Sequence, residues 1–158
     1  MEVKREDRPM DALWEVFQRR WALDKAAWRS VSKDLNPTEL RCIEYVGSHK
    51  SANATRLADF FFMTTGATCK LTKRLLAKDY LERYQKQDNR KEVYFRLSEK
   101  GNILYSTLSD LRQTLRHRDA PITETMTEDE YNVIFHFVLR YDDHLRRIQS
   151  NSRRQHNC

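Results

Sequence analysis

Apolar residues recur every seven positions in two segments near the ends of the chain, at about residues 10–33 and after residue 127. This spacing predicts two long helices, each with a narrow apolar stripe. Thr127 and Glu130 occupy the two positions of a capping box, which predicts where the second helix begins. The stripes consist of Trp14, Phe17, Trp21 and Trp28 in the first segment and of Tyr131, Ile134, Val138, Tyr141 and Leu145 in the second.

Both stripes need apolar partners, and we interpret them as a dimer interface. In so small a chain the two helices can pack on each other and on a second copy, and large aromatic residues are enriched in protein interfaces. An intramolecular core is the alternative, because an amphipathic helix needs no second subunit. The residues expected in the interface are Trp14, Phe17, Trp21, Tyr131, Ile134, Val138, Tyr141 and Leu145.

The middle of the chain follows a different pattern, of shorter helices. Asn36 and Glu39 are spaced as a helix cap and its capping-box partner, with Pro37 in the first turn, so a helix is expected from there to about Gly47. A short helix should follow near residues 55–62. Thr64 can cap another helix that runs to about residue 78. The apolar positions of these segments predict their core faces; they include Leu40, Ile43, Val46, Leu57, Ala58, Phe61, Leu71 and Leu75.

Two strand-like runs, residues 80–86 and 92–97, flank the polar segment Gln87–Lys91 and predict a hairpin. Ser98 should start a further helix, and Pro121 is expected in the loop before the last helix. The fold class expected is therefore mainly α with a small β-hairpin (α+β). We expect a compact unit over residues 36–101, a helical dimerisation lobe from residues 10–35 and 102–150, and flexible tails at residues 1–9 and 151–158.

Composition narrows the function. The formal net charge is +6 and the isoelectric point about 9.3, which favours anionic partners such as nucleic acid. No apolar run approaches the roughly 20 residues of a membrane span. The first ten residues lack the apolar stretch of a signal peptide, and the three cysteines suggest neither a disulfide framework nor a zinc site, so we expect a cytoplasmic location. Nucleophile-elbow, P-loop and HExxH motifs are absent from the sequence, which argues against an enzyme.

A helix beside a basic hairpin suits double-stranded DNA, because a helix fits the major groove and a thin cationic projection fits the minor groove. In the helix capped by Thr64, Leu71 and Leu75 should face inward, which leaves small, hydroxyl and cationic residues on the outer face. An ordinary solvated face is the alternative interpretation of these cations. The candidate DNA-binding residues are Thr64, Thr65, Gly66, Cys69, Lys70, Lys73, Arg74, Arg90 and Lys91.

Three segments, Leu75–Arg83, Asp88–Lys91 and Leu97–Gly101, resemble the multiple-antibiotic-resistance regulator (MarR) family of winged helix-turn-helix proteins, as does Pro37–Leu40. The resemblance implies a homodimer that binds a palindromic operator and often represses transcription until a small ligand or an oxidant releases it. It also implies that Arg90 is the wing-tip arginine.

In the same family pattern, Asp88 would brace the wing by pairing with a nearby arginine. The chain departs from the pattern at Asp79, where the family usually has a glycine in the left-handed conformation, and at Glu92, an acid beside the wing.

Few residues suggest what would switch such a regulator. Cys42 is expected to be buried, whereas Cys69 should lie beside Lys70 on the outer face of its helix, where oxidation would block DNA contact. The histidines show no metal-ligand spacing, and we expect no metal and no cofactor. A small-molecule pocket could be lined by Trp21, Trp28 and Phe61. The alternative functions are an architectural or protein-interaction module built on the same fold and, more remotely, RNA binding.

Overall fold

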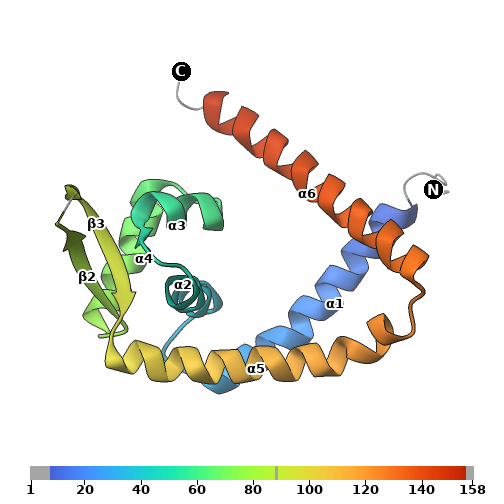
Figure 1. Cartoon of the computed structure of the whole chain (residues 1–158), viewed down its shortest axis with the longest axis horizontal. Coiled ribbons are helices and arrows are strands. Elements are labelled where there is room, and N and C mark those ends of the chain that lie inside the picture. The colour runs from blue at the N-terminus through green and yellow to red at the C-terminus, as the bar shows by residue number, and fades with distance from the viewer. Residues whose placement is uncertain (1–7, 88, 156–158) are drawn as a thin grey trace. The chain divides into compact units, whose positions relative to one another are not determined.

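The computed structural model describes residues 8–87 and 89–155 (Figure 1). These residues form six helices and a small antiparallel sheet, which confirms the expected fold class. The chain divides into two compact units between Leu115 and Arg116, within one helix. In chain order the elements are α1 (Arg8–Val31), α2 (Pro37–Ser48), β1 (Ala52–Asn53), α3 (Ala54–Phe61), α4 (Thr65–Ala77), β2 (Leu81–Lys86), β3 (Asn89–Leu97), α5 (Glu99–Glu124) and α6 (Glu128–Gln155).

Both predicted capping boxes are confirmed. At the start of α2, the backbone N–H of Glu39 donates to the Asn36 side chain at 3.0 Å, and the backbone N–H of Asn36 donates to the Glu39 carboxylate at 3.0 Å. At the start of α6, the N–H of Thr127 donates to the Glu130 carboxylate at 2.8 Å, and the N–H of Glu130 donates to the Thr127 hydroxyl at 3.3 Å. These local bonds satisfy N–H groups that a helix leaves unpaired at its first turn.

One hydrophobic core holds the first unit together, and the apolar faces predicted for α2 and α4 lie in it. Leu40, Ile43, Leu71 and Leu75 are each at most 2% exposed. Burial of such side chains contributes roughly 1.5–3 kcal/mol each. The end of α1 belongs to the same unit, because its Trp28 packs against this core.

The sheet has the strand order β1-β3-β2, and all its pairs are antiparallel. The hairpin of β2 and β3 was predicted, with Leu81 opposite Leu97. The sequence did not indicate β1, because two residues show no periodicity and become a strand only by pairing with Tyr94 and Phe95 of β3. This third strand connects the hairpin to the residues immediately before α3.

Pro121 was expected in a loop, and that prediction is wrong: it lies inside α5, three residues before the helix ends at Glu124. A proline in a helix removes one hydrogen bond, here to the carbonyl of His117 four residues earlier. His117 is exposed, so water can satisfy that carbonyl, and the fixed φ of proline suits a helix. The chain turns only after Thr125.

Candidate nucleic-acid interface

One face of α4 is fixed against the rest of its unit. The helix begins after Thr64, whose side chain accepts the N–H of Ala67 at 3.2 Å, as predicted. Thr68 and Thr72 are buried, and each hydroxyl donates to a backbone carbonyl of the same helix, at 3.2 Å to Thr64 and at 3.1 Å to Thr68. Together with the two buried leucines, these threonines determine which face of α4 remains available to a partner.

The opposite face of α4 is open at its first turns. Thr64, Thr65, Gly66, Lys70 and Lys73 are all exposed or partly exposed. A methyl group placed on Gly66 would meet no atom within 4 Å. A surface of hydroxyls, a glycine and two lysines permits close approach of another molecule and provides cations for it.

Two of the predicted contact residues are placed differently from the others. Cys69 is half-buried and lines a pocket toward the sheet, because its position on α4 lies at the border of the outer face. Arg74 is exposed, but its Nε lies 3.4 Å from a carboxylate oxygen of Glu39 in α2. That ion pair joins two different helices, and sequence patterns gave no sign of it.

The wing is the hairpin of β2 and β3. Arg90 and Lys91 lie at the beginning of β3, and both are exposed. The Gln85 side chain donates to the Arg90 carbonyl at 2.8 Å and holds the two strands together near the tip. Asp88, the predicted brace, lies outside the described residues.

Glu92, the acid beside the wing, accepts hydrogen bonds from two residues of the same unit. Its carboxylate accepts the hydroxyl of Tyr94 and, at 3.5 Å, the side-chain amide of Asn53. The bond to Glu92 raises the pKa of Tyr94, because it stabilises the protonated phenol. Lys86 lies over the Tyr94 ring, with its Nζ 4.6 Å from the ring centre. Glu92 therefore connects the wing to the residue that caps α3.

The turn between α4 and the wing is tightly bonded. Asp79 has a φ of 60°, the left-handed conformation expected at this position. The N–H of Tyr80 donates to the Leu75 carbonyl at 2.9 Å, and the Tyr80 carbonyl accepts the N–H of Ser98 at 3.2 Å. The Ser98 hydroxyl donates to the Asp79 carbonyl at 2.6 Å. The end of α4, the start of β2 and the start of α5 are thus joined at one point.

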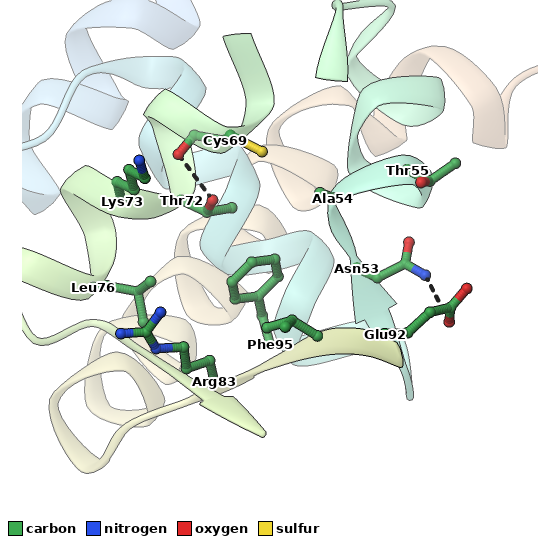
Figure 2. A pocket seen from close by; sticks show the side chains of 11 residues that line it. Asn53, Ala54, Thr55, Cys69, Thr72, Lys73, Leu76, Arg83, Glu92 and Phe95 are labelled. Atoms are coloured by element: carbon green, nitrogen blue, oxygen red, sulfur yellow. Dashed lines mark hydrogen bonds between the residues drawn. The ribbon is translucent and has the colours of Figure 1, made fainter. Parts of the chain in front are cut away.

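A pocket of about 290 Å³ lies between α4 and the sheet (Figure 2). Its walls combine apolar side chains with two cations, Lys73 of α4 and Arg83 of β2, and with the Glu92 carboxylate. Thr72 and Asn53, also in the wall, make the hydrogen bonds drawn in Figure 2. The remaining lining residues are Ala54, Thr55, Cys69, Leu76, Val93 and Phe95.

The three residues predicted to line a ligand pocket lie in different surroundings. Trp21 lines a surface depression with Pro37, Met63 and Lys70, among others. Trp28 and Phe61 instead pack against the hydrophobic core.

Cys42 of α2 is shielded from solvent. It is fully buried, as predicted. Burial raises the pKa of its thiol to about 12, and the nearby Glu39 carboxylate adds to the shift. The reactive thiolate is therefore scarce at neutral pH.

Apolar side chains remain exposed on α1 and on α6. On α1 these include Trp14, Phe17 and Trp21, which are 64%, 49% and 54% exposed. On α6, Tyr131, Ile134, Val138 and Leu145 are exposed, and Tyr141 is half-buried. No helix in the described part of the chain is long and apolar enough to span a membrane.

Comparisons with known sequences find relatives of the central part of this chain. A profile of the MarR family matches residues 35–93. The HTH-type transcriptional regulator YhjH of Bacillus subtilis (strain 168) is 32% identical over 96 residues, which are 61% of this chain and 55% of YhjH. The regulator PchR of the same organism is 23% identical over 103 residues, 65% of this chain and 61% of PchR. The matches thus span little more than half the length of these curated relatives.

Solved structures show the same fold. Streptococcus pneumoniae FabT, in a structure described as a complex with DNA, matches with a TM-score of 0.76 and 19% identity over 90% of this chain and 99% of FabT. RV1404 from Mycobacterium tuberculosis matches with a TM-score of 0.66 and 19% identity over 90% and 95% of the two chains. The matching family consists of transcriptional regulators and not of enzymes. Residues 35–93 of this chain thus match the MarR family in sequence, and the described residues share the fold of these solved structures.

Proposed function

We propose that this chain is a transcriptional repressor that binds double-stranded DNA, as a homodimer, at a palindromic operator. The observation that carries the proposal is the open outer face of α4 in the same compact unit as a cationic wing. A helix with exposed hydroxyls and lysines can read base edges in the major groove. Arg90 at the wing can enter the minor groove, where the negative potential attracts arginine. FabT, whose fold is similar, has been crystallised with DNA.

The homodimer in this proposal uses the exposed apolar residues of α1 and α6. Apolar areas of this kind on a soluble protein are typical of interfaces. A two-fold dimer would present two copies of α4 to two half-sites, which is why its operator would be palindromic. A DNA-binding regulator of this family would act in the cytoplasm.

We further propose that a small-molecule effector releases the DNA by entering the pocket between α4 and the sheet. An occupant would touch the reading helix and the wing at once, so it could change their relative position. Lys73 and Arg83 in the wall favour an anion with an apolar part. Screening such anions by their effect on DNA binding tests the idea. A releasing compound should lose its effect in an Arg83→Ala variant, and an undiminished effect there would place the effector elsewhere.

The proposed function predicts both a sequence preference and a role for the wing. We expect the protein to prefer a duplex selected from a random pool over random DNA by about 10³-fold or more at physiological salt. Arg90→Ala should weaken binding to both duplexes, because the wing contact is largely electrostatic. A plot of the logarithm of the variant's binding constant against the logarithm of the salt concentration should be shallower. Its slope should change by about 0.9 for each phosphate that the variant no longer neutralises. Fluorescence anisotropy at several salt concentrations measures both effects.

Arg19→Ala is the control, because it removes the same charge from an exposed α1 residue that pairs with Glu15 on the same helix. It should leave both affinities unchanged. Unchanged affinity of Arg90→Ala would show that the wing does not contact DNA. Equal affinity of the wild-type protein for both duplexes would favour the architectural or protein-interaction module instead.

A further inference from the structure

A buried carboxylate joins α2 to the second half of α4. The side chain of Glu39 is only 3% exposed. One of its oxygens lies 3.4 Å from Nε of Arg74, and the other lies 3.5 Å from Nζ of Lys78. The second oxygen also accepts the backbone N–H of Asn36. Arg74 lies in the last turn of α4 and Lys78 caps its end, so two successive turns of that helix converge on one acid.

The same contact reaches the connection between α1 and α2. The Lys78 ammonium donates to the backbone carbonyl of Asp34 at 2.7 Å. Apolar packing of Leu71 and Leu75 determines which face of α4 is inward, but it tolerates small slides along the helix axis. Ion pairs that end on a buried, hydrogen-bonded carboxylate have a defined length and direction. They therefore fix the position of α4 along its own axis.

The ion pairs also change what DNA would encounter. Arg74 and Lys78 continue the row of cations begun by Lys70 and Lys73 on α4. Their side chains are 58% and 37% exposed. Without Glu39 they could therefore turn outward and attract the phosphates of DNA of any sequence. With Glu39 in place, much of that charge is neutralised within the protein. Phosphate contacts raise affinity without reading sequence.

We propose that Glu39 is a positioning residue that sets sequence specificity: it holds α4 in register for base contacts and withholds Arg74 and Lys78 from non-specific phosphate binding. This inference rests on the proposed function, because it concerns how α4 reads DNA. Glu39 touches no DNA in this scheme and acts through α4.

The test is Glu39→Gln, which removes the charge but keeps the shape and the hydrogen-bond acceptor of the capping box. Arg74 and Lys78 are exposed enough to be solvated, so the variant should fold. We expect its affinity for the selected duplex to fall while its affinity for random DNA rises, so that the ratio of the two drops about tenfold or more. Binding to random DNA should also depend more steeply on salt, by about 0.9 in log–log slope for each additional phosphate that the variant neutralises.

Glu44→Gln is the matched control. Glu44 is buried in the same helix, and its carboxylate lies 2.7 Å from Arg112 of α5, away from α4. If a variant only destabilised the fold, its apparent affinities for the selected duplex and for random DNA would fall by the same factor, because only the folded fraction would change. A triple variant, Glu39→Gln with Arg74→Gln and Lys78→Gln, separates the two effects. It should lose the gain on random DNA and keep the loss on the selected duplex.

The outcomes distinguish this inference from the function on which it rests. If the wild-type protein shows no preferred duplex, both are overturned. If the wild-type protein has a preferred duplex and Glu39→Gln keeps the wild-type ratio, only the role of Glu39 is overturned. If the ratio of the affinity for the selected duplex to that for random DNA falls equally in Glu44→Gln, the proposed role of Glu39 is likewise overturned.

Discussion

Replacing Gly101 by alanine is expected to lower the free energy of unfolding by about 3 kcal/mol, near the upper end of what overpacking a core costs. A Cβ atom at this position would lie 2.1 Å from the carbonyl oxygen of Tyr80. That oxygen cannot move aside easily, because it accepts the N–H of Ser98 at the point where α4, β2 and α5 are joined. Relief of the clash must break this bond or shift α5.

Urea unfolding, followed by tryptophan fluorescence and circular dichroism, measures the effect. Gly66→Ala is the matched control, because a Cβ there meets no atom within 4 Å. Since alanine is a better helix former than glycine, that variant should be as stable as the wild-type protein or more stable by up to about 1 kcal/mol. Equal midpoints for Gly101→Ala and the wild-type protein would contradict the packing described for this turn.

Placing an aspartate at Val138 is expected to dissociate the proposed dimer. Val138 is 52% exposed and lies in the apolar stripe of α6. A carboxylate in the buried centre of an interface loses its hydration without gaining a partner, which costs several kcal/mol per ion. Each monomer would then bind one half-site alone. Loss of the linkage between two half-sites should weaken operator binding by about 10²-fold or more.

Sedimentation at micromolar concentration and anisotropy on the selected duplex measure the two effects. Val133→Asp makes the same change on the same helix, at a residue that is 70% exposed and outside the predicted stripe. It should remain dimeric. A wild-type protein that sediments as a monomer would remove the dimer from the proposed function, and a dimeric Val138→Asp would move the interface off this stripe.

Features governed by neighbouring residues could be predicted from the sequence. The capping pairs Asn36–Glu39 and Thr127–Glu130 are local, and spacing alone indicates each of them. The left-handed conformation of Asp79 was expected from the residue that the family usually has there. Pro121 shows the limit of such rules, because a proline in the last turns of a helix loses a single bond and need not end it.

Features governed by distant residues could not be predicted. Arg74 shares α4 with the other predicted DNA-contacting cations, whereas its ion-pair partner Glu39 lies on α2. Glu92 looked like an isolated acid, yet it bonds to Tyr94 and Asn53. Cys69 lies at the edge of the outer face, and only the packing of the sheet against α4 shows which side it faces. In each case the missing information was the tertiary partner.

The short strand β1 has a consequence for protein engineering. A two-stranded hairpin on its own is marginally stable in water, and here β3 also pairs with Ala52 and Asn53. Asn53 in turn caps α3 and bonds to Glu92. A wing transplanted from a relative as residues 81–97 alone would meet a foreign edge strand and a foreign cap. The smallest segment that carries its own supports is residues 52–97, so chimeras should exchange the short helices and the wing together.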